Sequence, residues 1–121
     1  MNGLHLTADL YHCKPQHALL TDLDLLKNLC ERAVHDAGLL AVNSLFHHFT
    51  PTATSGITGV VLLAESHLAI HTWPEQSSVT LDVYVCNFGA DNSHKAEALL
   101  DTLVTAFEPT QTQRNRLVRG F

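Results

Sequence analysis

Hydrophobic residues recur at helical spacing in two stretches of the chain. The first stretch begins at Thr21 or Asp22, which can cap a helix, and ends at Gly38, a residue typical of helix C-termini. The second begins within residues 91–93 and ends before Pro109. The inward positions follow the i, i+3, i+4, i+7 rule and are Leu26, Leu29, Cys30, Ala33, Val34 and Ala37, then Ala96, Leu99, Leu100, Leu103, Val104 and Phe107. We therefore predict two amphipathic helices.

The remaining segments contain apolar residues that alternate with polar ones or form short β-branched runs. The clearest alternation covers residues 79–86. We predict strands over residues 4–11, 39–49, 57–64, 67–73 and 79–86, and a last short strand over 113–121. Residues 50–56 are predicted to form a loop, and residues 74–78 a turn.

The order of these elements defines the fold class. One strand and one helix are followed by four strands, then by a helix and a strand. Strands grouped in this way predict an antiparallel sheet with both helices on one face. The fold class is therefore α+β, a two-layer α/β sandwich, in a single domain covering residues 1–121. Because two helices cover only one face, we expect the other face to be buried against a second copy in a dimer.

Composition and charge limit the function classes. A hydrophobic content of 45% and a charged content of 16% describe an ordinary folded domain, with neither an export signal nor a stretch apolar enough for a membrane helix. Three cysteines without a CxxC spacing fit a reduced, cytoplasmic chain. Arg114, Arg116 and Arg119 hold three of the seven basic residues, which leaves four against twelve acidic residues before them. This balance argues against nucleic acid and mildly favours a cationic small ligand.

Residues 62–75 break the strand pattern, because Glu65, Ser66 and His67 interrupt an apolar stretch. Buried polar groups need partners, and local rules that fail in one cluster usually mark a functional site. The Ser66 hydroxyl could attack the Glu65–Ser66 peptide, and elimination would then leave a pyruvoyl group at the new N-terminus. Such a ketone can form a Schiff base with an amine and withdraw electrons. From these residues alone, a hydrogen-bonded serine at a strand end is the commoner explanation.

Two histidines follow this serine. His67 and His71 are four residues apart and would share one face of a helix or a strand. They could hold zinc only with a third ligand such as Cys86 or His47, and a hydrogen-bonded strand histidine is the simpler interpretation. Ser66 and His71 are five residues apart, so an ideal strand would place them on opposite faces. We therefore expect the chain to bulge or turn near Ser66, or the break in the peptide to free it.

Five segments together carry a specific combination of motifs, over residues 5–11, 46–49, 56–59, 63–75 and 82–86. The central motif is Glu65-Ser66-His67-Leu68-Ala69-Ile70-His71-Thr72-Trp73-Pro74-Glu75, followed by Cys86. In this combination the chain closely resembles the small prokaryotic S-adenosylmethionine decarboxylases. The resemblance extends over most of the chain and favours a functional role for Ser66.

The resemblance implies a self-cleaving proenzyme whose pyruvoyl cofactor derives from Ser66. Cleavage after Glu65 would give a β chain, residues 1–65, and an α chain, residues 66–121. The enzyme would decarboxylate S-adenosylmethionine to supply the aminopropyl donor for spermidine synthesis, as a homodimer of processed units and without a metal. The implied roles are processing for Thr58 and His71, protonation of the substrate's α-carbon for Cys86, adenine stacking for Phe49 and ribose binding for Glu75.

Three departures from the family pattern leave alternatives open. The loop over residues 50–55 is longer than usual and directly follows Phe49, Asn87 follows Cys86 where glycine is frequent, and Thr58 stands where serine is frequent. The changed loop leaves open a pyruvoyl-dependent L-ornithine or L-arginine decarboxylase on the same scaffold. An unprocessed homologue without catalytic activity is a further alternative.

Overall fold

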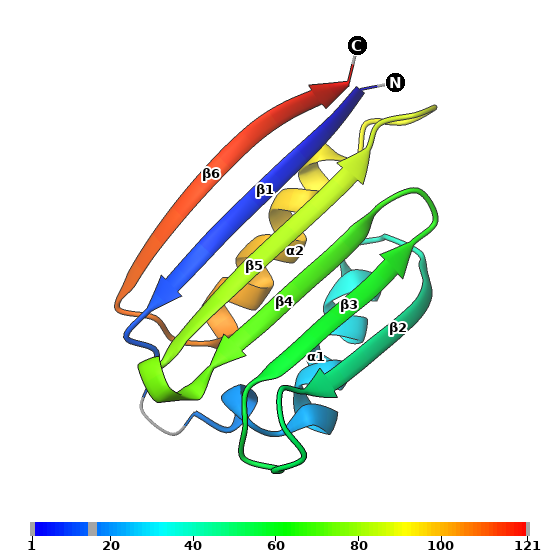
Figure 1. The fold of residues 1–121 in the computed structure, drawn as a ribbon. Helices are drawn as coiled ribbons and strands as arrows, with labels where there is room; N and C mark the ends of the chain where they lie inside the picture. The colour runs from blue at the N-terminus through cyan, green and yellow to red at the C-terminus, as the bar shows by residue number, and fades with distance from the viewer. Residues whose placement is uncertain (1, 15–16, 121) are drawn as a thin grey trace.

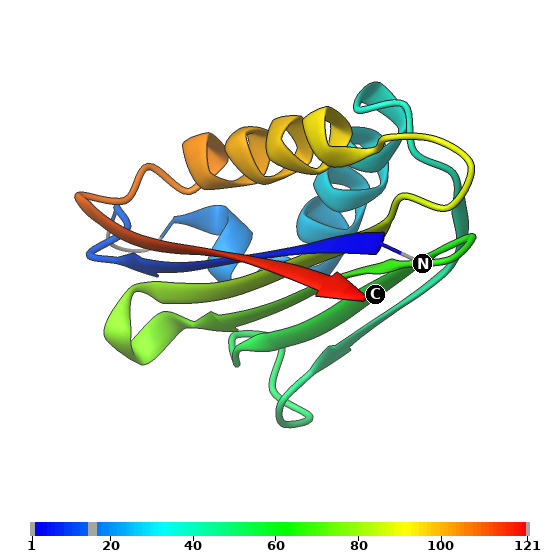
Figure 2. The same ribbon diagram turned by 90° about the horizontal axis from the view of Figure 1, so that it is seen from above.

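The computed structural model describes residues 2–14 and 17–120 of the chain. Its sheet is antiparallel, with the strand order β2-β3-β4-β5-β1-β6 (Figure 1). The strands are β1 (Asn2–Tyr11), β2 (Ala41–His48), β3 (Ile57–Leu63), β4 (His67–Trp73), β5 (Ser78–Cys86) and β6 (Gln111–Gly120). The helices α1 (Leu23–Asp36) and α2 (Ser93–Ala106) both lie on one face of the sheet (Figure 2). The predicted α+β two-layer sandwich is confirmed.

Both ends of α1 follow from residues visible in the sequence. The Asp22 carboxylate accepts a hydrogen bond from the backbone N–H of Leu25 at 3.0 Å, which satisfies a free donor in the first turn. At the other end, Gly38 has a φ of +82°, a left-handed conformation that glycine adopts without a steric penalty. The helix therefore begins and ends where its sequence predicts.

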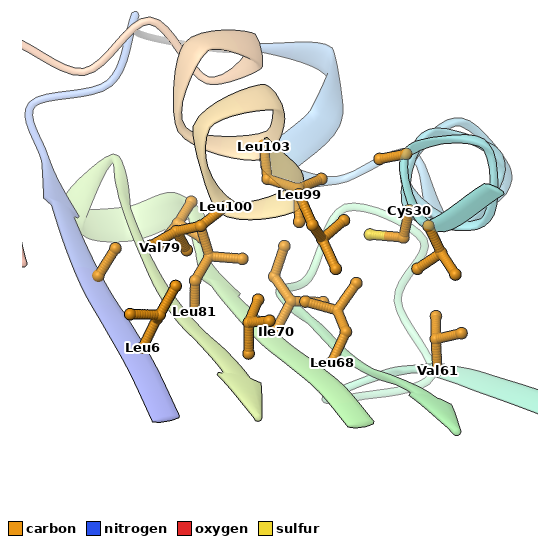
Figure 3. Packing of buried hydrophobic residues seen from close by; sticks show 14 of the residues in the cluster. Leu6, Cys30, Val61, Leu68, Ile70, Val79, Leu81, Leu99, Leu100 and Leu103 are labelled. Carbon is orange, nitrogen blue, oxygen red and sulfur yellow. The ribbon is translucent and has the colours of Figure 1, made fainter. Parts of the chain in front are cut away.

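The hydrophobic core lies between the sheet and the two helices. Alternate side chains of the inner strands point at the helices, which is the arrangement that period-two alternation produces. Figure 3 shows strand residues facing helix residues across this layer, namely Leu6, Val61, Leu68, Ile70 and Leu81 against Cys30, Leu99, Leu100 and Leu103. Thr72 is buried in this core, and its hydroxyl donates to the carbonyl of Leu20 at 2.8 Å.

The last strand is longer than predicted. β6 spans ten residues, Gln111–Gly120, and pairs with β1 along its whole length; the predicted end at Phe121 lies outside the described residues. All ten residues are exposed, so this strand has no apolar alternation to reveal it. Two of its arginines instead reach α2, where Arg114 pairs with Asp101 at 2.7 Å and Arg116 with Glu97 at 3.5 Å.

Other boundaries differ by one or two residues. β2 begins at Ala41 and not at residue 39, and its register with β3 shifts between Ala41 and Asn43, where a bulge interrupts the pairing. Two short 3-10 helices, η1 (Ala18–Leu20) and η2 (Pro74–Gln76), also occur; the first was not predicted, and the second replaces part of the predicted turn.

No element within residues 2–14 and 17–120 covers the second face of the sheet, which we call the open face (Figure 2). Alternate residues of every strand point to it, including His71 on β4, Tyr84 on β5 and Leu45 on β2. Leu45 is 70% exposed, although it lies within a strand. The dimer predicted to bury this face stays a prediction. Neither helix of the described residues is long and apolar enough to cross a membrane.

Candidate active site

Ser66 lies in the loop between β3 and β4 and not within a strand. The backbone N–H of Leu63 donates to the carbonyl of Ser66 at 2.9 Å, and the N–H of Ser66 donates to the carbonyl of Leu63 at 3.5 Å. Ala64 and Glu65 therefore form a two-residue hairpin loop, and the predicted strand over 57–64 ends one residue early. The predicted turn is therefore present, but Ser66 pairs with Leu63 across it, so the turn alone does not bring Ser66 to the face of the sheet that carries His71.

Ser66 contacts Cys86, which ends β5. The backbone N–H of Cys86 donates to the Ser66 hydroxyl oxygen at 2.9 Å. Ser66 is half-buried, Cys86 is buried and Glu65 is exposed. These residues, with Asn92 and the segment 38–40 after α1, line a cavity of about 160 Å³. The structure thus brings two predicted catalytic residues, 20 apart in sequence, to one cavity.

Thr58 and His71 form a second pair. They are direct cross-strand partners on β3 and β4, and the Thr58 Oγ1 lies 3.2 Å from the His71 Nδ1. Both side chains are partly buried. The contact with the Thr58 hydroxyl therefore fixes the orientation of the imidazole.

Aromatic rings lie next to this pair. The centroids of the Phe49 and Trp73 rings are 5.0 Å apart at an interplanar angle of 61°, and the His71 and Trp73 rings are 6.2 Å apart. Glu75 follows on η2 and is exposed. Trp73 was not among the predicted site residues, although a tryptophan at the end of a predicted strand is a recognisable signal in the sequence.

The predicted residues therefore form two separate groups within one chain. Ser66 and Cys86 lie at the end of the sheet where β4 begins and β5 ends (Figure 1). His71 is the fifth residue of β4, and four residues of strand from His67 span about 13 Å. His71 consequently cannot touch Ser66 of its own chain. Phe49, Trp73 and Glu75 lie further still toward the opposite end.

The remaining candidates have other surroundings. The ring of His67 packs against Tyr84 at 5.7 Å, so His67 and His71 have different partners. Within residues 2–14 and 17–120, no group of three or more His, Cys, Asp or Glu side chains is arranged to hold a metal ion. Cys13 and Cys30 are buried, and burial raises the pKa of the Cys30 thiol to about 12, which keeps it protonated and unreactive.

Two asparagines next to Cys86 were not predicted as site residues. The Nδ2 of Asn92 donates to the carbonyl of Cys86 at 2.9 Å, and the Oδ1 of Asn87 accepts from the backbone N–H of Asn92 at 2.8 Å. No spacing rule reveals such contacts, because they depend on the path of the loop between β5 and α2.

Comparison with known proteins agrees with this geometry. The family model described as S-adenosylmethionine decarboxylase matches residues 4–120. The chain is 37% identical to the S-adenosylmethionine decarboxylase proenzyme of Hydrogenobaculum sp., covering 98% of this chain and 81% of that protein. It is 35% identical to the proenzyme of the same name from Archaeoglobus fulgidus, covering 98% and 97%. The crystal structure of the adenosylmethionine decarboxylase from Aquifex aeolicus superposes with a TM-score of 0.84 at 37% identity, covering 98% of this chain and 91% of that chain.

Fold and site together define a class of small α+β decarboxylase domains, with a serine in the β3–β4 loop beside a cysteine at the end of β5. Within that class, the chain belongs to the S-adenosylmethionine decarboxylase family.

Proposed function

We propose that this chain is a self-processing S-adenosylmethionine decarboxylase whose pyruvoyl cofactor is made from Ser66. The observation that carries the proposal is the position of the Ser66 hydroxyl, beside a two-residue turn and 2.9 Å from the N–H of Cys86. The matching relatives favour S-adenosylmethionine over ornithine or arginine as substrate.

Cleavage would proceed at the Glu65–Ser66 peptide. The Ser66 oxygen attacks the Glu65 carbonyl carbon, the C–N bond breaks, and an ester with a free amine results. Loss of the Ser66 α-proton then expels the Glu65 carboxylate and leaves dehydroalanine. Water replaces its nitrogen, which leaves as ammonia, and a ketone remains at the N-terminus of residues 66–121. In this scheme His71 moves the α-proton of Ser66, and the Thr58 hydroxyl orients the His71 imidazole.

The residues beside Ser66 suit the group that would form there. The ketone supplies an electron acceptor for the amine and carboxylate of the substrate. Cys86 borders the same cavity, so its thiol is placed to return a proton to the substrate's α-carbon. Phe49 and Trp73 offer stacking surfaces for an adenine, and Glu75 offers a carboxylate for ribose hydroxyls.

The separation of the two groups supports a homodimer. A second copy packed open face to open face, with its strands running the opposite way, would bring His71 of one chain to Ser66 of the other. It would also bury apolar side chains such as Leu45 and Leu62, which are 70% and 47% exposed in the single chain. We therefore propose that each site uses residues of both copies.

Ser66→Ala tests the cleavage. The variant should stay full-length on a denaturing gel, whereas the wild-type chain should give two fragments. Ser44→Ala is a matched control, because the Ser44 hydroxyl donates to the carboxylate of Glu31 on α1, away from the site. Cleavage of Ser66→Ala would contradict the pyruvoyl assignment, and an uncleaved wild-type chain would favour the non-catalytic homologue.

Mixed dimers test the shared site. Ser66→Ala and His71→Ala chains carrying different tags are produced together, and each is also produced alone. A site shared between copies predicts cleavage of the His71→Ala chain in the mixture only, since a mixed dimer has one intact Ser66–His71 pair. A site within one chain predicts no cleavage in the mixture.

The substrate is tested by intact mass after incubation with cyanoborohydride and S-adenosylmethionine. A smaller fragment carrying a trapped amine derived from S-adenosylmethionine is expected. Trapping only with ornithine or arginine would support the alternative decarboxylase.

A further inference from the structure

The backbone of Cys86 is held on both sides. Its N–H donates to the Ser66 hydroxyl oxygen at 2.9 Å, and its carbonyl accepts from the Nδ2 of Asn92 at 2.9 Å. Beyond it, the N–H of Asn87 donates to the carbonyl of Asn2 on β1 at 2.7 Å. The Ser66 hydroxyl oxygen accepts from the Cys86 N–H, so the direction of this N–H determines where the hydroxyl oxygen lies. It therefore also determines which rotamer the Ser66 side chain adopts. Whatever orients Cys86 therefore also positions Ser66.

Asn92 does not act as its place in the sequence suggests. It is the N-cap residue of α2, and asparagine is among the preferred residues there because its side chain accepts from the first turn of the helix. Its side chain makes no capping hydrogen bond and instead reaches back to the carbonyl of Cys86. The Asn92 side chain therefore contacts the site and does not cap the first turn of α2.

Asn87 holds Asn92 in this position. The Oδ1 of Asn87 accepts from the backbone N–H of Asn92 at 2.8 Å, and its Nδ2 donates to the hydroxyl of Ser93 at 3.3 Å. The side-chain amides of Asn87 and Asn92 thus link the two ends of the loop between β5 and α2. Asn87 bonds to Asn92, and Asn92 bonds back to Cys86. A glycine at position 87 would supply neither contact, since it has no side chain.

We propose that Asn92 is a positioning residue for self-cleavage, which orients the Cys86 backbone toward Ser66 and is itself held by the side chain of Asn87. This proposal rests on the self-processing proposed above. It predicts that loss of the single Nδ2–H donor slows cleavage without destabilising the fold.

The test compares two isosteric variants that add the same charge at neighbouring positions. Asn92→Asp loses the donor to the Cys86 carbonyl but keeps a good N-cap residue, favoured by the helix dipole. Asn87→Asp keeps the oxygen that accepts from Asn92. Cleavage is followed by time course on denaturing gels during cell-free synthesis, and thermal unfolding is measured on the same variants in a Ser66→Ala background.

Asn92→Asp should cleave about tenfold more slowly with an unchanged or higher Tm, as expected for the loss of one hydrogen bond in the reacting state. Asn87→Asp should stay within about threefold of wild type. The neutral variant Asn92→Ser should cleave as slowly as Asn92→Asp, because serine also lacks a donor that reaches Cys86.

Wild-type cleavage by Asn92→Asp would overturn the proposal, and so would equal slowing by Asn87→Asp, which would make added charge the cause. Slowing that parallels a loss of Tm would also overturn it, by showing that Asn92 acts through the fold. A wild-type chain that never cleaves would overturn the proposed function, and this inference with it.

Discussion

At the residue scale, Gly56 lies where the loop after β2 meets Phe49 and the end of β4. A Cβ atom at this position would lie 2.4 Å from the backbone oxygen of Thr72 and 2.7 Å from the ring of Phe49. Thr72 cannot move aside, because it is buried and its hydroxyl is bonded to Leu20. The close approach that places Phe49 beside Trp73 therefore requires glycine.

Gly56→Ala should lower the free energy of unfolding by about 3 kcal/mol, because the methyl group overpacks a contact with fixed backbone. It should also displace the Phe49 ring and raise the KM for S-adenosylmethionine. Urea denaturation and steady-state kinetics measure the two effects. Ala53→Gly in the same loop is exposed and should change the free energy of unfolding by less than about 1 kcal/mol. Equal stability of Gly56→Ala and wild type would contradict the packing argument.

Residues with reactive groups could be proposed as site residues from the sequence, whereas contacts made by the folded loops could not. Ser66 drew attention because Glu65, Ser66 and His67 interrupt an apolar stretch, whereas the roles of His71 and Cys86 followed from the resemblance that the whole motif carries. Their predicted roles await experiment. Asn92 looks like an ordinary helix cap, and its contact with Cys86 arises only from the folded loop.

At the element scale, the regular spacing of apolar residues decided which helices and strands could be predicted. The helices and β5 repeat apolar residues at 3.6 or 2 positions, and their predicted bounds agree closely with the structure. β6 has no such repeat, since Arg114 and Arg116 occupy positions where a covered strand would carry apolar side chains. Ladder pairing with β1 and contacts with α2 explain its full length, and neither is local in sequence.

The ion pairs of β6 should contribute little to stability. In the pair Arg114–Asp101 the side chains are 41% and 60% exposed, so water and salt screen the attraction. A double-mutant cycle of Arg114→Ala and Asp101→Ala, read by urea denaturation, should give a coupling free energy below about 1 kcal/mol. A coupling of several kcal/mol would mean that the pair, more than the backbone ladder, holds this edge strand.

At the scale of the whole molecule, the proposed dimer would connect assembly across the open face with the chemistry of the site. The residues of the two groups lie toward opposite ends of one sheet, which a single chain cannot bring together. Assembly across that face should therefore be a condition for cleavage and not only for stability.

Val60→Asp tests this dependence. Val60 lies in the middle of β3, between Thr58 and Leu62 on the open face, so a buried carboxylate there should weaken the dimer. Analytical ultracentrifugation should show monomers, and the rate of cleavage should fall in parallel. Leu25→Asp is the control, because Leu25 is exposed on α1 in the helix layer and should leave both unchanged. Full cleavage by a monomeric Val60→Asp chain would contradict the shared site.

The order of the strands also decides what becomes of the two pieces after a cut at Glu65. The first piece would carry β1, β2 and β3, and the second β4, β5 and β6. In the sheet, however, β1 lies between β5 and β6, and β3 pairs with β4 across the cut. The pieces are interleaved, so that dilution cannot separate them and only unfolding can. The mature protein would migrate as one species in a native gel. The cut would break one peptide bond and leave every strand paired with the same neighbouring strands.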